Sequence, residues 1–188
     1  MDNSERIKLS KKLTYLLRHG AEEKGLTIQS DGYIQVLHIL RLPGYRGMSL
    51  PKIQEIVQKC EKQRFELKNE NNLWLIRASQ GHTMRSINDD ELLTPLNEND
   101  PVQYCIHGTY QETIPLIQAT GLNKMKRNHI HFAESLPGVN GVISGMRSSC
   151  TAIIVIDMKA AMRDGIQFYR STNNVILSPG VGDTGTIP

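Results

Sequence analysis

The chain has 188 residues, which is enough for one domain or two small ones. Its three cysteines, without a CxxC pair, exclude a disulfide framework and argue against a zinc site, and no apolar run reaches membrane-spanning length. The net charge of +3 is uneven: residues 1–90 carry 15 Lys and Arg against 11 Asp and Glu, whereas residues 91–188 carry 7 against 8, so the first half is the better candidate for an anionic partner such as nucleic acid.

The first half is predicted to contain three helices followed by a β-hairpin. The pattern of apolar residues, caps and turn formers places helices over 4–17 and 33–40, a helix after Ser49, and strands over 64–68 and 73–77. Ser4 and Ser49 are the expected N-caps, and Asp31-Gly32 is an expected turn. Three helices and a hairpin are typical of a winged helix, which is common among nucleic-acid binders.

The second half is predicted to be richer in strands, so the fold class is α+β. Strands are expected over 103–107, 129–132, 151–157 and 174–178, and helices over 112–120 and 158–164. The strand over 151–157 is continuously apolar and is expected to be buried. An acidic, turn-rich stretch at 86–101 separates the halves, and we place the lobes at 1–90 and 102–188 with a linker at 91–101.

The segment Gly180–Gly185 matches the glycine pattern of dinucleotide-binding folds. That pattern needs a following helix whose N-terminus faces the pyrophosphate. Only three residues follow Gly185. We therefore reject a nucleotide site here and expect a flexible tail.

Several basic and polar motifs in the first half suit a phosphate ligand. Arg18-His19 stands where the first helix is expected to end, and its alternative role is to offset the helix dipole. Arg64 begins a strand, although a solvated run of charges looks similar. Arg77, Gln80 and His82 leave the second hairpin strand together and can contact phosphate and ribose, as can the polar turn of any sheet.

The second half holds further candidates. His107-Gly108-Thr109 follows an apolar strand; a two-histidine phosphodiesterase would need a second His-x-Ser/Thr motif, which the chain lacks. His129 and His131 fall on one face of a strand, where they either bind a metal or make ordinary hydrogen bonds. A cleft between the lobes could gather the cations of both halves around one phosphate. These cations are Arg18, His19, Arg64 and Arg147.

Seven motifs in order give the chain a specific resemblance. They are Leu17-Arg18-His19, Lys62–Phe65, Arg77 with Gln80-Gly81-His82, His107-Gly108-Thr109, Arg127–His131, Ile143–Arg147 and Asn174–Leu177. From about Leu9 to Leu177 the sequence resembles the RNA 2′-phosphotransferase family, the tRNA 2′-phosphotransferases.

The resemblance implies an N-terminal winged-helix lobe and a C-terminal lobe with the split β-sheet of the ADP-ribosyltransferase fold. It implies an enzyme that removes an internal RNA 2′-phosphate, as left at a tRNA splice junction, by transferring it to ADP-ribose. NAD+ is consumed as co-substrate, and the products are 2′-OH RNA, nicotinamide and ADP-ribose 1″,2″-cyclic phosphate. No metal and no membrane are expected to take part, and a monomer is expected.

The resemblance also implies roles for residues. Catalytic roles fall to the phosphate-gripping tetrad of Arg18, His19, Arg64 and Arg147, with His19 the candidate for proton transfer. Residues expected to bind NAD+ are His107, Gly108, Thr109, His131, Ser144, Gly145 and Val175, with Ile176 as the other choice for the last position. Residues expected to face the RNA are Arg77, Gln80 and His82.

Two alternatives stay open. The first is an ADP-ribosyltransferase acting on terminal phosphates of RNA or DNA; a protein acceptor is disfavoured because Val175 stands where protein-modifying relatives carry a catalytic Glu. The second is a winged-helix nucleic-acid-binding protein without catalysis, and a phosphodiesterase is a distant third. The polar, acidic residues 1–6 contain no signal region, so we expect an intracellular protein, cytoplasmic or nuclear.

Overall fold

The structure, a computed structural model, describes residues 1–136, 139, 146–147 and 149–188. It divides into two compact units, Met1–Leu92 (unit 1) and Leu93–Pro188 (unit 2). Both units mix helices and strands, which agrees with the α+β class. In the described residues no helix is long and apolar enough to cross a membrane. Cys60, Cys105 and Cys150 are free thiols, as expected.

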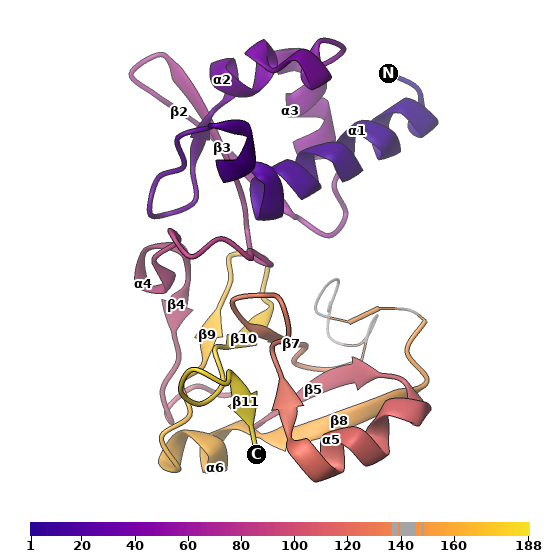
Figure 1. Cartoon of the computed structure of the whole chain (residues 1–188), viewed down its shortest axis with the longest axis vertical. Coiled ribbons are helices and arrows are strands. Elements are labelled where there is room, and N and C mark those ends of the chain that lie inside the picture. The colour runs from indigo at the N-terminus through magenta and orange to yellow at the C-terminus, as the bar shows by residue number, and fades with distance from the viewer. Residues whose placement is uncertain (137–138, 140–145, 148) are drawn as a thin grey trace. The chain divides into compact units, whose positions relative to one another are not determined.

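Unit 1 combines helices with a small antiparallel sheet of order β1-β3-β2 (Figure 1). Its helices are α1 (Asn3–Tyr15), α2 (Val36–Arg41), α3 (Leu50–Gln58) and α4 (Asp89–Leu92). Its other helical turns are the π-helical η1 (Leu16–Gly20) and the 3-10 turns η2 (Glu22–Lys24) and η3 (Pro43–Tyr45). Its strands are β1 (Ile34–Gln35), β2 (Phe65–Glu70) and β3 (Leu73–Ala78).

The hairpin β2–β3 confirms the expectation for the end of the first half. Phe65 pairs with Ala78 and Glu70 with Leu73, so two residues form the turn. Asn71 and Asn72 have φ angles of 50° and 63°. Positive φ at both positions is the geometry of a type I′ turn, whose twist matches that of the strands.

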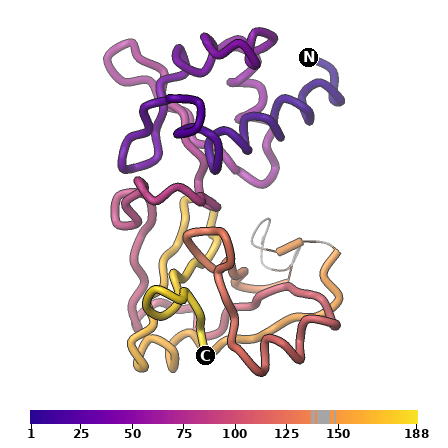
Figure 2. Tube along the Cα trace, in the orientation of Figure 1, coloured from indigo at the N-terminus to yellow at the C-terminus, as the bar shows by residue number. Residues whose placement is uncertain are grey.

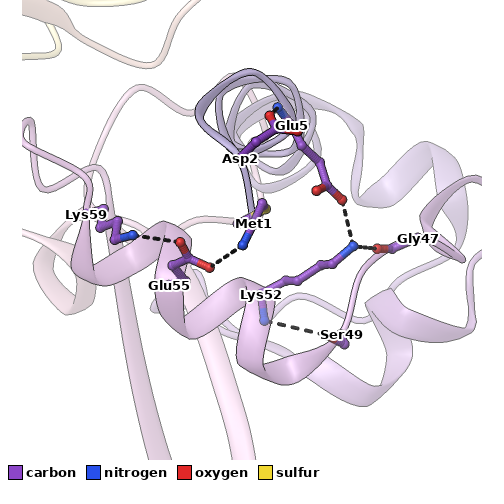
Figure 3. Close-up of polar contacts among 8 residues, drawn as sticks. All are labelled: Met1, Asp2, Glu5, Gly47, Ser49, Lys52, Glu55 and Lys59. Atoms are coloured by element: carbon purple, nitrogen blue, oxygen red, sulfur yellow. Dashed lines mark hydrogen bonds and ion pairs between the residues drawn. The ribbon is translucent and has the colours of Figure 1, made fainter.

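The packing of α1 on α3 forms one side of unit 1. Leu13, Leu16 and Leu17 are fully buried, whereas Ile7 near the start of α1 is exposed. Lys52 of α3 donates to a carboxylate oxygen of Glu5 on α1 at 2.6 Å (Figure 3). These contacts fix the two helices against each other.

Two local expectations for unit 1 need correction and one is confirmed. Asp2, not Ser4, caps α1, because the Asp2 carboxylate accepts from the Glu5 amide at 2.8 Å. The second helix starts at Val36 rather than Tyr33, because Ile34 and Gln35 pair with β3 instead. Ser49 caps α3, as expected, by accepting from the Lys52 amide.

Unit 2 contains more strands than helices. Its strands are β4 (Thr94–Pro95), β5 (Tyr104–Thr109), β6 (Leu122–Asn123), β7 (Ile130–Phe132), β8 (Ala152–Asp157), β9 (Tyr169–Arg170), β10 (Ile176–Ser178) and β11 (Thr186–Ile187). Its helices are α5 (Ile114–Thr120), entered through the 3-10 turn η4 (Gln111–Thr113), and α6 (Met158–Arg163). Both helices were expected. The segment 91–101, expected as a linker, includes β4, which pairs with β9.

The strands of unit 2 form a four-stranded sheet of order β4-β9-β10-β7 and the pairs β5–β8 and β6–β11, all antiparallel. Ile106 of β5 and Ala133, just after β7, exchange backbone hydrogen bonds of 2.9 Å in both directions. Within the described residues, this isolated bridge joins the β5–β8 pair to the larger sheet. The core beneath includes Cys105, Phe132, Met158 and Phe168.

Two expectations for unit 2 are wrong. The strand β8 is not buried throughout, because Ile153 and Val155 are exposed while the residues between them are partly covered. The end of the chain is not a loose tail, since β11 pairs with β6 and Ile187 is only 4% exposed. Figure 2 shows the C-terminal segment, in yellow, folded back onto unit 2. No helix follows Gly185, so the rejection of a dinucleotide site there stands.

Candidate functional site

In unit 1 the pair Arg18-His19 lies on the π-helical turn η1, directly after α1. Leu16 and Leu17 of the same turn are fully buried and hold its backbone in the core. The Arg18 carbonyl accepts from the backbone amide of Thr83 at 3.0 Å. A π turn is rare in helices and frequently marks a functional site. Here it presents a cation and an imidazole next to each other from a buried base.

Thr83 orients the imidazole of His19. The Thr83 hydroxyl lies 3.1 Å from His19 Nδ1 and 3.4 Å from the Arg18 carbonyl oxygen. When the hydroxyl donates its single hydrogen to the Arg18 carbonyl, its oxygen accepts from Nδ1–H of His19. In the neutral ring this assignment makes Nε2 the nitrogen that accepts a proton.

The loop after β3 gives the side chain of Arg18 its place. A Cβ atom added to Gly81 would lie 3.1 Å from both Nε and Cζ of Arg18, and Gly81 has a φ of 92°. The backbone conformation favours glycine, and a side chain here would press on Arg18. Gln80 and His82, on either side, are buried.

Arg64 is held by the turn that joins α3 to β2. Its backbone amide and its Nη1 lie 3.4 and 3.6 Å from the sulfur of Cys60. Gln63 takes a φ of 44°, and its carbonyl accepts from the Ser79 hydroxyl at 2.9 Å. The Ser79 amide donates to the Arg64 carbonyl at 2.9 Å. The turn is thus fixed on both sides of Arg64.

His19 and Arg64 line one cavity of about 630 Å³ within unit 1. Its walls are the exposed side of α1, the end of α3 and the turn before β2. The structure therefore brings together two of the four predicted phosphate-binding residues and places Arg18 on the same turn as one of them.

Arg77 has internal partners. It is 8% exposed, and its Nη2 pairs with Glu66 at 2.9 Å while its Nη1 donates to the Asp31 carbonyl at 2.9 Å. Its guanidinium also lies over the Tyr33 ring, 4.6 Å from the centroid. These contacts join the hairpin to the turn before β1. RNA contact by Arg77, Gln80 and His82 stays a prediction.

In unit 2 His107 lies in β5, where burial and one hydrogen bond define its state. Its Nδ1 lies 2.8 Å from the His131 carbonyl, which only accepts, so Nδ1 carries the hydrogen. Burial lowers the pKa of His107 from its ordinary 6.5, and the bond to His131 opposes this shift. The ring packs edge-on against Phe132. His107 is therefore neutral at physiological pH, which suits contact with an uncharged group.

Gly108 directs its backbone to the edge of β5 that faces away from β8. The neighbouring Ile106 bonds to Ala133 on that edge, whereas the Thr109 carbonyl accepts from Thr151 on the β8 side. Because bonding direction alternates along a strand, the Gly108 N–H and C=O point to the same edge as those of Ile106. The Gly108 N–H and C=O are therefore a donor and an acceptor at one strand edge, and together they can bind an amide group. Glycine is needed here, since an added Cβ would lie 2.2 Å from Cγ of Met146.

Thr109 lies one residue further along β5 and has a hydroxyl partner. Its Oγ1 is 2.8 Å from Oγ1 of Thr113, which itself donates to the Tyr110 carbonyl at 2.7 Å. The hydrogen of Thr113 is thereby used, so Thr109 donates to it. This bond ties the end of β5 to the turn η4.

His131 and Val175 lie on or next to the four-stranded sheet. His131 of β7 pairs with Leu177 of β10, and Val175, just before β10, is fully buried. Arg147 is exposed. Burial, together with the positive charge of Arg147, lowers the pKa of Arg127. Two guanidiniums near enough to repel each other favour an anion beside them.

Not every predicted residue is described, and several relevant ones were missed. Ser144 and Gly145 lie outside the described residues. Sequence reasoning overlooked Thr83 and Tyr15 in unit 1 and Thr113 in unit 2, whose roles depend on contacts across the fold. Thr83 had one signal, its position right after His82. Within the described part of the chain, no three His, Cys, Asp or Glu residues gather as for a metal ion.

The comparisons with known proteins agree with one another on the family that this chain resembles. The sequence model of the family described as RNA 2′-phosphotransferase, Tpt1 / KptA family, matches residues 4–180. The chain is 41% identical over 182 residues to tRNA 2′-phosphotransferase 1 of Danio rerio, covering 95% of this chain and 80% of that protein. It is 39% identical over 184 residues to tRNA 2′-phosphotransferase of Saccharomyces cerevisiae, covering 93% and 79%. A Schizosaccharomyces pombe relative is 44% identical over 93% of this chain, which spans only 47% of that protein's length.

Proposed function

The chain belongs to the RNA 2′-phosphotransferase, Tpt1 / KptA family, and from this premise we propose that it removes an internal 2′-phosphate from RNA, such as spliced tRNA. The phosphate is transferred to ADP-ribose, and NAD+ is the co-substrate. RNA with a 2′-OH, nicotinamide and ADP-ribose 1″,2″-cyclic phosphate are the products. RNA processing would take place in the cytoplasm or nucleus.

The observation that carries this proposal is the cavity of unit 1. His19 and Arg64 line this cavity together with further Lys and Arg side chains. Guanidiniums keep their charge at every physiological pH and match a phosphate with parallel donors. A 2′-phosphate is already a competent nucleophile, so it needs positioning more than it needs a base. Arg18, with Gly81 beneath it, and Arg64, on its fixed turn, are suited to that task.

His19 is the proposed proton-transfer residue. The Thr83 hydroxyl holds the hydrogen on Nδ1, which leaves Nε2 as the base when the ring is neutral. The proton that His19 would accept belongs to the ribose 2″-hydroxyl that attacks the phosphate. Arg147, with Arg127 as a neighbouring charge, would stabilise the negative charge on the phosphorus oxygens.

NAD+ supplies the ribosyl carbon to which the phosphate becomes attached as nicotinamide leaves. The residues of β5 fit this co-substrate: the Gly108 backbone offers a donor and an acceptor for a carboxamide, and His107 is neutral beside it. Thr109, His131 and Val175, with Ser144 and Gly145, are proposed to complete the binding surface. Arg77, Gln80 and His82 are proposed to face the RNA.

We also propose the family's fold for each unit. Helices followed by the hairpin β2–β3 support a winged-helix lobe in unit 1. The single bridge between Ile106 and Ala133 supports the split sheet of the ADP-ribosyltransferase fold in unit 2.

The test is conversion of a short RNA that carries one internal 2′-phosphate and a 5′ label, with and without NAD+ and without added metal. We expect the 2′-OH product and ADP-ribose cyclic phosphate only when NAD+ is present. A stable ADP-ribosylated RNA would instead indicate the terminal-phosphate transferase, and binding without conversion would indicate a non-catalytic module.

Arg64→Ala and Arg147→Ala are each expected to abolish turnover while the protein still folds, as judged by circular dichroism. Arg46→Ala is the matched control, because Arg46 is an exposed arginine that does not line the cavity. Wild-type turnover by a folded Arg64→Ala protein would contradict the assignment of Arg64.

A further inference from the structure

The cavity next to His19 extends far beyond the residues that a single phosphate needs. The α1 side contributes seven residues at helical spacing: Asn3, Arg6, Ile7, Ser10, Lys11, Thr14 and Tyr15. The opposite side contributes Ile56, Lys59, Cys60, Glu61, Lys62 and Arg64. From Arg6 to Tyr15 the α1 side runs for about 14 Å at 1.5 Å per residue. That length corresponds to about four nucleotides stacked at 3.4 Å.

The walls of this groove are held in place before any ligand binds. Glu5 of α1 pairs with Lys52 of α3, and the N-terminal amine pairs with Glu55 at 3.6 Å (Figure 3). Within the groove Arg6 donates from Nη1 to the Lys59 carbonyl at 3.2 Å. A groove with fixed walls binds an extended ligand at a lower entropic cost than one that must form.

The charge of the groove suits a polyanion. Its lining has five Lys and Arg side chains and one carboxylate, that of Glu61. Lys59 is partly neutralised by Glu55, at 2.8 Å, whereas Lys11 is exposed on the α1 side. Cations spread along a groove, rather than clustered at one point, match the spaced phosphates of a nucleic-acid strand.

Tyr15 adds a flat apolar surface at the His19 end. It is 54% exposed, and its ring centroid lies 5.7 Å from that of His19. A Cβ added to Gly20 would come within 2.9 Å of Cε1 of Tyr15. The ring therefore lies against the π turn, which limits its movement. Exposed aromatic rings in basic grooves are the platforms on which single-stranded bases stack.

We propose that this groove binds the single-stranded RNA flanking the 2′-phosphate, with Tyr15 stacking on the base of an adjacent nucleotide and Lys11 contacting a phosphate further along. The proposal rests on the proposed function, because the groove continues from His19 and Arg64. The alternative ligand is an acidic peptide, which would bind the cations of the groove but would not stack on Tyr15.

The stacking is tested with a double-mutant cycle, in which Tyr15 is substituted and the neighbouring RNA base is removed. Wild type, Tyr15→Leu and Tyr15→Phe are assayed with NAD+ on RNAs in which the base 5′ or 3′ of the 2′-phosphate is present or abasic. We expect removal of one of the two bases to lower kcat/KM of the wild type and of Tyr15→Phe by about tenfold. Tyr15→Leu should be insensitive to the same removal. If Tyr15→Leu loses as much as the wild type on abasic RNA, the stacking is refuted.

The phosphate contact is tested by the salt dependence of binding, measured by fluorescence anisotropy on the same RNAs without NAD+. Lys11→Ser should reduce the slope of log K against log salt by about 0.7, the value for one contact with single-stranded nucleic acid. Lys8→Ser is the matched control, because Lys8 is exposed on α1 but does not line the groove. Equal slopes for the two variants, or competition by poly-glutamate as strong as by RNA, would overturn the proposal.

The two assays separate this inference from the proposed function. If the wild type converts none of the RNAs, the proposed function fails, and the anisotropy of the same variants still tests the groove. If the wild type converts them all and the Tyr15 and Lys11 variants behave like their controls, the groove inference alone fails.

Discussion

At the scale of single residues, the hydroxyl of Thr83 is the contact on which the proposed role of His19 depends. We expect Thr83→Val to lower kcat for RNA 2′-phosphate removal by about tenfold to a hundredfold, because the ring loses the acceptor that fixes its tautomer and direction. Thr83→Ser keeps the hydroxyl and should retain most of the activity. The measurement is kcat over a range of pH with NAD+ saturating; equal loss in both variants would point to a packing role instead.

His107 makes the stability of unit 2 depend on pH. Burial lowers its pKa, so below pH 6.5 the unfolded chain binds more protons than the folded one. The stability that His107 contributes is complete above pH 6.5 and is lost as the pH falls from there through the folded pKa. We expect the melting temperature to drop between pH 7 and pH 5 by less in His107→Asn, which keeps a donor for the His131 carbonyl. Parallel profiles of melting temperature against pH for the wild type and His107→Asn would contradict this expectation.

The three free thiols should differ sharply in reactivity. Burial raises the pKa of Cys105 to about 12, and its side chain has no exposed surface. The thiolate is the reactive species, so Cys105 should be inert in the folded protein. Labelling with a thiol reagent at pH 8 is expected to modify Cys60 and Cys150, which are only partly buried, and to reach Cys105 only on unfolding. Fast labelling of the Cys60→Ser, Cys150→Ser double variant would refute the assignment.

At the scale of elements, the turn of the β2–β3 hairpin can be made more stable by substitution. Asn72 has a φ of 63°, which costs less for glycine than for any residue with a side chain. We expect Asn72→Gly to raise the free energy of unfolding by about 0.5 kcal/mol, since Asn-Gly is the preferred type I′ pair. Asn69→Gly, in the extended part of β2, should lower it by about 0.5–1 kcal/mol. Urea unfolding measures both changes, and the opposite order would contradict the turn type.

The strand β11 should contribute measurably to unit 2. Ile187 is buried in the core that includes Leu122 and Phe132. We expect Ile187→Ala to cost about 2–4 kcal/mol, the usual range for removing a buried isoleucine side chain. Val181→Ala is the control, because Val181 is exposed. Equal unfolding free energies for the two variants would mean that β11 does not pack as described.

The elements that sequence patterns predicted well are those defined by nearby residues. The hairpin, the Ser49 cap and the end of α5 at Thr120 each depend on local backbone chemistry. The strand β11 and the pairing of Ile34 with Ile76 require partners far along the chain, which no local pattern reveals. The exposure of Ile153 was missed because an apolar strand does not tell how many of its faces are covered.

In the candidate site, too, local motifs could be predicted from the sequence and long-range contacts could not. Arg18, His19 and Arg64 were recognised from their motifs, and the structure gathers His19 and Arg64 in one cavity. The π-helical form of η1 was not predictable, because its Arg18 carbonyl bonds to Thr83, 65 residues away. The roles of Thr83 and Tyr15 depend on their contacts with that turn.

At the scale of the whole molecule, each unit has its own buried core and its own set of proposed functional residues. We expect the separate chains 1–92 and 93–188 each to fold, with cooperative melting by circular dichroism, since compact units with separate cores can fold alone. Neither should remove the 2′-phosphate, because His19 and Arg64 belong to unit 1 whereas Arg147 belongs to unit 2. Turnover by residues 93–188 alone would contradict the proposed division of roles.

The π turn also bears on how this sequence can change over evolutionary time. A π turn contains one residue more than an α turn, so deleting a single residue between Tyr15 and Ala21 would let the helix close regularly. The helix on either side of the deletion would keep its orientation, because only the extra residue is removed. The wide turn that presents Arg18 and His19 next to each other would be lost. The length of this segment is therefore constrained together with its buried leucines and its proposed catalytic residues. Functional descendants of this chain should align without gaps from Leu13 to Ala21.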